Sequence, residues 1–395
     1  MNSFHLGMQV LFWLSLGLVV YTYFLYPVVL FVVYSLAQLA SDARYLLHRQ
    51  DRRVPPLRED AIPEISFLIP AHNEREHILQ KVANLREMDY PPQKLQIVFV
   101  SDGSTDETNE ILKGLPDLNI EVVVLPHQSG KASALNQAAL RARHDILVFS
   151  DASTLFASDA LRKLSRHFAD ARVGAVCGAL RFHASAESQQ TEGIYWKYES
   201  MIRLMEGRLG ATMTASGAIY ALRRKAYLPL NPSTVLDDFV IPMNARKAGY
   251  RVLYDPEATA TDYAPESVKG EFARRVRLAS GSFRSLIFLL RVPMGGFGRF
   301  AFISHKLLRW ILPLLLCTLL IGNVALLRQP LYFVFGALQL CFYLWAGFGY
   351  VFHERMRGVK FALLAYFVLA MNFAFLLGLF RSLTGHEEAT WQRIS

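Results

Sequence analysis

The sequence predicts an α/β fold with a doubly wound, mostly parallel sheet, joined to transmembrane helices. Two apolar runs, 95–100 and 146–149, each end directly in Ser-Asp. Short runs of Ile, Val, Leu and Phe closed by turn residues are typical of buried strands in a parallel sheet. Long apolar stretches near both ends of the 395-residue chain predict the membrane-spanning part.

Strands alternate with helices four times after residue 64. The first strand is predicted at 65–69, stopped by Pro70, and a helix capped by Asn73 follows to about Arg86. The later pairs are a strand before Asp102 with a helix to about Lys113, a strand at 121–125 with a helix at 132–143, and a strand before Asp151 with a helix capped by Ser158. This alternation is typical of a sheet wound on both faces.

The turn after residue 100 also has a purely structural explanation. Ser104 and Glu107 fit a capping box at the start of the next helix. A second acidic strand end at Asp151 favours a binding site, because ligands bind outside the carboxyl ends of the strands in open α/β sheets.

The membrane part is predicted as one helix before the central domain and about three after it. Residues 8–40 carry no charged side chain and are long enough to cross a bilayer. The later spans are expected at about 307–327, 331–352 and 361–380. Lys and Arg concentrate after the first span and before the last one, so the positive-inside rule places the central domain in the cytoplasm. We therefore expect a multi-pass protein of the inner cell membrane.

Composition excludes several other classes of protein. The net charge of +9 comes without a basic patch interleaved with aromatic residues, which favours a lipid surface and anionic substrates over nucleic acid. The three cysteines are isolated, so neither a zinc site nor a disulfide framework is indicated. No Gly-x-Gly-x-x-Gly follows a strand and no P-loop is present, which argues against dehydrogenases and NTPases.

A series of short motifs runs through the central domain in a fixed order. They are IPAHNE at 69–74, SDGSTD at 101–106, GK at 130–131 with ALN at 134–136, DAS at 151–153, SGA at 216–218 with RR at 223–224, LDD at 236–238 and RRVR at 274–277. Together they resemble family 2 glycosyltransferases with the GT-A fold. The flanking apolar helices resemble the membrane-bound polysaccharide synthases of that family, such as cellulose, chitin, hyaluronan and poly-N-acetylglucosamine synthases.

The resemblance implies four parts of the chain. They are an N-terminal transmembrane helix with a basic flank at 1–50, a cytoplasmic GT-A domain at 51–270, an amphipathic interfacial segment with the arginine motif at 271–298, and C-terminal transmembrane helices with a tail at 299–395.

The resemblance also implies a pocket for a UDP-sugar donor. Ala71, His72 and Glu74 are expected to line the uracil and ribose pocket, and Asp102 is expected to accept a hydrogen bond from the uracil. Lys131 is expected near the diphosphate. The alternative for this lysine is a solvated side chain at a helix start.

Asp151 stands where the family has its Asp-x-Asp motif, which holds the ribose and a Mg²⁺ or Mn²⁺ ion on the diphosphate. The second acid of the motif is replaced by Ser153, which is a weaker, neutral ligand. The resemblance still implies a divalent metal held by Asp151 and Ser153, with water and phosphate oxygens, or a lower metal affinity.

Asp237 and Asp238 match the family's Thr-Glu-Asp stretch, whose last acid is the general base. We expect Asp238 to accept the proton of the acceptor hydroxyl and Asp237 to support it, because two adjacent acids raise one pKa toward neutrality. The alternative is a helix N-terminus, where acids are favoured for structural reasons.

Residues 274–277 stand where the family has Gln-x-x-Arg-Trp. Arg277 matches the arginine that grips the diphosphate, while Arg274 replaces the glutamine and Leu278 the tryptophan. The missing tryptophan leaves acceptor binding and processivity open. The alternative for residues 272–290 is a basic amphipathic helix that lies on the inner leaflet, and the two interpretations are compatible.

The expected function is inverting transfer of a sugar from a UDP-sugar to a glycan or lipid-linked acceptor, in exopolysaccharide or surface-glycan synthesis. Other subunits of a polysaccharide synthase are expected partners. Two alternatives stay open: a polyprenyl-phosphate sugar synthase, whose phosphate acceptor needs no base, and a non-catalytic scaffold subunit, which the changes at Ser153 and Leu278 favour. A transporter is disfavoured, because the spans carry no ionisable residue near a midplane.

Overall fold

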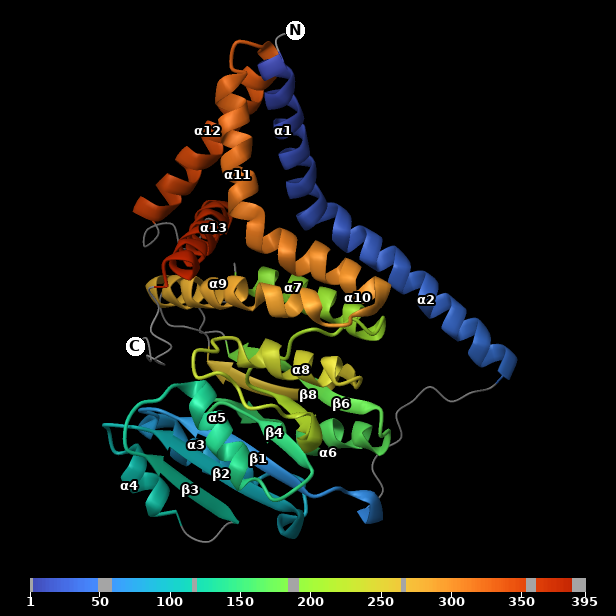
Figure 1. Ribbon diagram of the computed structural model, residues 1–395, viewed down its shortest axis with the longest axis vertical. Helices are drawn as coiled ribbons and strands as arrows, with labels where there is room; N and C mark the ends of the chain where they lie inside the picture. Colours follow the sequence, from blue (N-terminus) through green and yellow to red (C-terminus); the bar gives the residue numbers. More distant parts are fainter. Residues whose placement is uncertain are drawn as a thin grey trace.

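The computed structural model describes residues 3–48, 59–115, 119–183, 192–263, 268–352 and 360–385. Figure 1 shows a sheet covered by helices at one end of the molecule and long helices at the other end. Helices α7, α9 and α10 lie between these two parts.

An eight-stranded sheet forms the centre of the domain, with the strand order β3-β2-β1-β4-β7-β6-β8-β5. The strands are β1 (Ile65–Ala71), β2 (Leu95–Asp102), β3 (Ile120–Leu125), β4 (Ile146–Phe149), β5 (Leu155–Phe156), β6 (Val173–His183), β7 (Tyr220–Arg223) and β8 (Arg251–Tyr263). Pairs β1–β2, β1–β4, β2–β3 and β6–β8 are parallel, whereas β4–β7, β6–β7 and β5–β8 are antiparallel. The sheet is therefore mixed, and its first four strands, β1 to β4, are parallel as predicted.

Helices cover both faces of the sheet, as the strand-helix alternation predicts. Every residue of β1, β2 and β4 is buried, which is typical of central strands covered on both sides. Ile65 and Phe67 face a core shared with α3 (Arg75–Arg86), α4 (Thr108–Lys113) and α6 (Ala160–Ser165). Leu68 faces the opposite core, shared with α5 (Lys131–Arg141) and α8 (Asp237–Lys247).

The predicted helix caps are wrong, and the side chains of Asn73 and Ser104 bond to other groups. Helices α3, α4 and α6 follow Glu74, Glu107 and Asp159 instead of Asn73, Ser104 and Ser158. Pro70 does not end β1, which continues to Ala71 in register with β2.

Asn73 joins the turn after β1 to the turn after β2. It adopts a left-handed backbone conformation, with a φ of 55°. Its side-chain oxygen accepts hydrogen bonds from the backbone N–H groups of Thr105 at 2.8 Å and Asp106 at 3.4 Å, and its own N–H donates to the Ser104 hydroxyl at 3.1 Å. The two turns that carry the predicted nucleotide pocket are thus fixed to each other.

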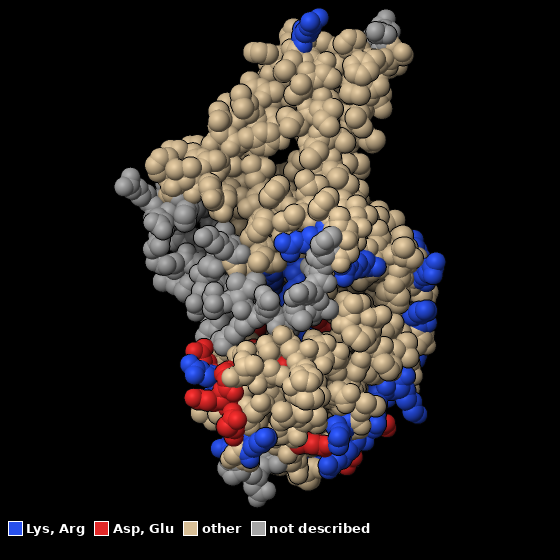
Figure 2. Space-filling view, turned by 60° about the vertical axis from the view of Figure 1, so that its left-hand side comes forward, with Lys and Arg blue, Asp and Glu red and all other residues tan. Residues whose placement is uncertain are grey.

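Among the described residues, four helical stretches are long and apolar enough to cross a membrane, one near the N-terminus and three in the C-terminal part, as predicted. They are Ser3–Leu47, Gly295–Ala325, Pro330–Val351 and Ala365–Thr384. The elements are α1 (Ser3–Val20), η1 (Tyr21–Leu25), α2 (Tyr26–His48), α10 (Gly295–Ala301), η6 (Phe302–Leu307), α11 (Leu308–Ala325), α12 (Pro330–Val351) and α13 (Lys360–Thr384). In Figure 2 the surface of these helices is almost entirely uncharged, whereas Lys and Arg side chains gather below them.

Two helices connect the apolar part to the sheet. They are α7 (Glu192–Arg208) and α9 (Val268–Arg291). Helix α13 packs closely on α9 at Gly378, where a Cβ atom would lie 2.5 Å from the Cβ of Ala279. A larger residue at this position would push the two helices apart.

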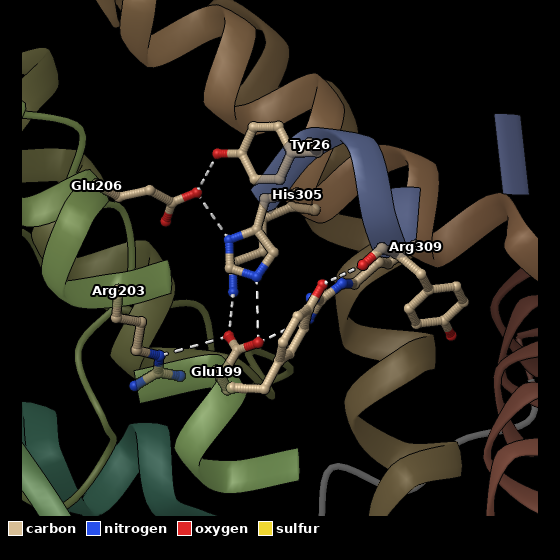
Figure 3. Close-up of polar contacts among 9 residues, drawn as sticks. Tyr26, Glu199, Arg203, Glu206, His305 and Arg309 are labelled. Atoms are coloured by element: carbon tan, nitrogen blue, oxygen red, sulfur yellow. Dashed lines mark hydrogen bonds and ion pairs between the residues drawn. The ribbon is translucent and has the colours of Figure 1, made fainter. Parts of the chain in front are cut away.

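A buried cluster of charged residues joins α7 to the apolar helices (Figure 3). His305 is fully buried, and its ring nitrogens lie 3.2 Å from the carboxylate of Glu199 and 2.8 Å from that of Glu206. The Tyr26 hydroxyl donates to the same Glu206 oxygen at 2.6 Å, and Arg309 donates to Glu199 at 2.6 Å. Three segments that are far apart in the sequence therefore meet in one cluster.

The cluster keeps Glu199 ionised. Burial favours the neutral acid, but the neighbouring His305, Lys306 and Arg309 side chains hold the pKa of Glu199 well below its ordinary value. A buried carboxylate that neutralises several cations is costly to remove, because its partners are left uncompensated away from water.

We predict that Glu199→Gln destabilises the junction by about 3 to 5 kcal/mol, the usual effect of removing one partner from a buried ion pair. Thermal unfolding of the detergent-solubilised protein measures this. Glu257→Gln is the matched control, since Glu257 pairs with Arg166 at 2.7 Å but its side chain is 61% exposed. Equal unfolding temperatures for the two variants would show that the buried cluster contributes no more than a surface pair.

Candidate functional site

One lysine and carboxylates from two elements meet at the carboxyl end of β4. Lys131 is the first residue of α5, Asp151 follows β4, and Asp237 is the first residue of α8. The Lys131 Nζ atom lies 2.7 Å from Asp151 Oδ1 and 3.4 Å from Asp237 Oδ2. Residues that the sequence assigns to the diphosphate, the metal and catalysis are therefore neighbours.

The charges of this cluster shift the pKa values of its members. Burial and, to a smaller extent, the adjacent Asp237 raise the pKa of Asp238 to about 6, against the opposing effect of Lys131. Burial also raises the pKa of Asp237, against the effect of Lys131. Burial lowers the pKa of Lys131, but Asp151 and Asp237 reverse this and bring it above its ordinary value. Asp238 is thus deprotonated at neutral pH but more basic than an exposed aspartate.

Asp102 fixes the backbone in front of Lys131. Its side chain is fully buried, and its two oxygens accept hydrogen bonds from the N–H groups of Ser129 at 2.7 Å and Gly130 at 2.8 Å. Gly130 has a φ of 90°, a conformation that favours glycine. Asp102 therefore positions the start of α5, and its predicted contact with uracil stays a prediction.

The other residues predicted to line the nucleotide pocket lie beside Asp102. Ala71 ends β1 and is paired with Ser101 in β2. The His72 ring nitrogen Nδ1 lies 2.7 Å from the carbonyl oxygen of Asp102. The backbone N–H of Glu74 donates to the Thr108 hydroxyl at 2.8 Å. The four predicted residues are thus brought together at the carboxyl ends of two adjacent strands.

Asp238 lines a cavity of about 230 Å³ between the sheet and the apolar helices. The cationic side chains in its wall are Arg203, Arg274, Arg275, Lys306 and Arg309. Arg275 was not among the predicted site residues, and the predicted Arg277 is not among the residues that line this cavity in the described part of the chain. Figure 2 also shows blue side chains in the hollow below the apolar helices.

The cavity contains an aromatic side chain that the sequence motif lacks. Leu278 lines it at the position of the family's tryptophan, and Trp310 lines it from α11. Trp310 is 6% exposed and packs edge-on against Phe239, which follows Asp238. No local pattern around position 310 could have identified this residue, because it comes from an apolar helix far away in the sequence.

The residues present fit a divalent metal only with help from the substrate. Among the described residues, no group of three or more His, Cys, Asp or Glu side chains is arranged to hold a metal ion. Asp151 and Asp237 nevertheless direct carboxylate oxygens at one cation, the Lys131 ammonium. Mg²⁺ and Mn²⁺ accept such oxygen ligands when substrate phosphates and water complete the shell.

Comparison with known proteins agrees with these features. Residues 66–228 match the model of a protein family described as glycosyl transferase family 2. Poly-beta-1,6-N-acetyl-D-glucosamine synthase of Staphylococcus aureus (strain COL) is 27% identical over 273 residues, 66% of this chain and 65% of that protein. An N-acetylglucosaminyltransferase of Mesorhizobium japonicum is 28% identical over 287 residues, 66% of this chain and 67% of that protein. The chain thus spans about 65% of the length of the staphylococcal synthase that it matches.

A solved structure extends the likeness to the apolar helices. A mannosyltransferase from Pyrobaculum calidifontis, in complex with GDP-Man and Mn²⁺, superposes with a TM-score of 0.69. The match covers 97% of this chain and 99% of the other at 22% identity, which shows a shared fold. Residues 66–228 therefore match the family 2 glycosyltransferase model, within a chain that has a GT-A glycosyltransferase fold.

Proposed function

We propose that this protein is a membrane-embedded, inverting glycosyltransferase that transfers a sugar from a UDP-sugar to a glycan or lipid-linked acceptor. The reaction takes place at the cytoplasmic face of the membrane, in exopolysaccharide or surface-glycan synthesis. The observation that carries the proposal is the position of Asp238, which lines a cavity and adjoins the cluster of Lys131, Asp151 and Asp237.

The donor binds at the carboxyl ends of β1, β2 and β4. The nucleoside is surrounded by Ala71, His72, Glu74 and Asp102, because these residues lie together at the carboxyl ends of two adjacent strands. Lys131 meets the diphosphate as a point charge. The preference for UDP rests on the resemblance to polysaccharide synthases. GDP is the competing nucleotide, since the mannosyltransferase with the same fold was solved with GDP-Man.

Asp151, with the Ser153 hydroxyl, would hold Mg²⁺ or Mn²⁺, and the bound ion would supply positive charge for the departing nucleoside diphosphate. Lys131 already pairs with Asp151 at 2.7 Å, so a diphosphate arriving there meets a lysine and a carboxylate that are held in place.

Asp238 takes the proton from the acceptor hydroxyl as that oxygen attacks C1 of the sugar from the face opposite the nucleotide. This direction of attack inverts the configuration at C1. Gly217 leaves room beside the carboxylate, because a Cβ atom there would lie 3.4 Å from Asp238 Oδ2. Asp237 stays paired with Lys131 and raises the basicity of its neighbour.

The acceptor occupies the cavity in front of Asp238. Trp310 lines this cavity from α11 and gives the acceptor pocket an apolar contact in place of the tryptophan missing at Leu278. Trp310 lies on α11, within an apolar stretch long enough to cross a membrane, so acceptor binding occurs next to the bilayer. This location suits a lipid-linked acceptor or a glycan that leaves along the membrane helices.

Asp238→Asn is expected to lower turnover by about 10² to 10⁴-fold, the usual contribution of a general base, because the amide cannot accept a proton. UDP affinity should stay near wild type. Asp237→Asn should lower turnover by less, since the role of Asp237 is to raise the pKa of Asp238. Transfer of labelled sugar by purified protein, with calorimetry for UDP, measures both effects. Wild-type turnover in Asp238→Asn would rule out Asp238 as the general base and would favour a phosphate acceptor.

Transfer should lose activity below about pH 6. The pKa of Asp238 is raised from its ordinary value to about 6, so the base is deprotonated above this pH and becomes protonated as the pH falls through it. The rate should drop about tenfold per pH unit on the acid side. Because Asp237 helps to raise this pKa, Asp237→Asn should move the acid limb to lower pH. UDP binding measured at each pH is the control, and an unmoved limb would contradict the coupling of the two acids.

Removal of divalent metal should abolish transfer. EDTA should stop the reaction, and an excess of Mn²⁺ or Mg²⁺ should restore it, because Asp151 and the diphosphate hold the metal together. EDTA saturated with Mg²⁺ before addition controls for nonspecific effects of the chelator. Full activity in free EDTA would mean that Lys131 and the arginines neutralise the leaving group alone.

A further inference from the structure

A fully buried lysine lies beneath the turn that carries Asp151. Lys81 belongs to α3, and none of its surface is exposed. Its Nζ atom donates to the Ser150 hydroxyl at 2.6 Å and also to the backbone carbonyl oxygen of Thr154. These two acceptors stand at either end of Asp151-Ala152-Ser153. One ammonium group therefore holds both ends of the segment that is expected to bind the metal and the diphosphate.

The surroundings of this lysine make its burial costly. The Nζ atom lies 5.2 Å from the ring centroid of Phe67 and 4.9 Å from that of Phe156. Burial lowers the pKa of Lys81 to about 7, although the carboxylates of Asp151 and Asp262 act in the opposite direction. A core that needed only to fill this space would be served by an apolar side chain of the same length, since an unmatched buried charge is strongly unfavourable.

The turn is also bonded to strand β8 of the sheet. The Thr154 hydroxyl donates to the carboxylate of Asp262 in β8 at 3.1 Å. Lys81 thus anchors the turn to α3, and Asp262 anchors it to β8. The amino group of Lys81 therefore lies behind a turn whose front carries the carboxylate of Asp151.

We infer that Lys81 is a positioning residue for the donor site, which fixes the turn 150–154 so that the Asp151 carboxylate faces Lys131 and the metal-diphosphate group. This inference rests on the proposed role of Asp151 in donor binding. The requirement for a fixed turn is stronger here than in a site with two acids, because Ser153 leaves Asp151 as the only charged ligand of the motif. A weak ligand set gains most from being held in its binding geometry before the ligand arrives.

Lys81→Met in the full-length protein tests the inference. Methionine keeps the length of the side chain and suits the space between Phe67 and Phe156, but it donates no hydrogen bond. Lys94→Met is the matched control. The Nζ atom of Lys94 also donates to a backbone carbonyl, that of Ile62 at 2.7 Å, but it does so at the amino ends of the strands, away from the site.

Two measurements are made on each variant in detergent. Hydrogen–deuterium exchange of segment 150–156 without nucleotide reports the order of the turn, and calorimetry with UDP at increasing Mn²⁺ reports the donor site. We expect Lys81→Met to speed exchange of the segment and to raise the Mn²⁺ concentration for half-maximal UDP binding at least tenfold. Lys94→Met should leave both quantities within twofold of wild type.

Ser150→Ala provides a second variant in case Lys81→Met does not fold. It removes one of the two acceptors of Lys81 and a single oxygen atom. We expect about a threefold increase in the Mn²⁺ requirement and faster exchange of the same segment. Wild-type exchange and Mn²⁺ dependence in either folded variant overturn the inference. A wild-type protein that binds no UDP instead overturns the proposed function, and the exchange measurement then still decides whether Lys81 orders the turn.

Discussion

The site depends on one ammonium group shared by two carboxylates. Lys131 pairs with Asp151 after β4 and with Asp237 at the start of α8, and so joins the parallel half of the sheet to the helix that carries Asp238. The lysine is itself held by Asp102, whose oxygens accept from the backbone N–H groups that precede α5. The proposed nucleotide pocket and the candidate base come from distant parts of the chain, and both are tied to this charge.

The same charge separates the roles of two adjacent acids. Asp237 is neutralised by Lys131, whereas Asp238 lines the cavity and has a raised pKa because it is buried beside another carboxylate. Different environments for neighbouring carboxylates are how proteins divide structural and proton-transfer roles. Part of the cavity wall comes from α11, whose Arg309 is held by Glu199, so the buried ion cluster that joins the two parts of the molecule also shapes the cavity.

Local sequence predicted the strands β1 to β4, the helices on both faces of the sheet and the four apolar stretches, because each depends on a pattern repeated over many residues, whereas β5 to β8 were not predicted. The predictions of the helix caps were wrong. Asn73, for example, bonds to a turn 32 positions away instead of to its own helix. Lys81 and Trp310 were missed for a related reason, since each acts through contacts that no local pattern records. Arg309 did leave a signal, as a charge at the start of a predicted span, and such residues often have functional partners.

The stereochemistry of the product tests the central claim most directly. Purified protein is supplied with a UDP-sugar whose C1 carries the nucleotide in the α configuration, and the linkage of the transferred sugar is determined by nuclear magnetic resonance. Attack by a hydroxyl that Asp238 deprotonates on the face opposite the nucleotide requires a β-linked product. An α-linked product would contradict direct displacement and the assignment of Asp238 as the base.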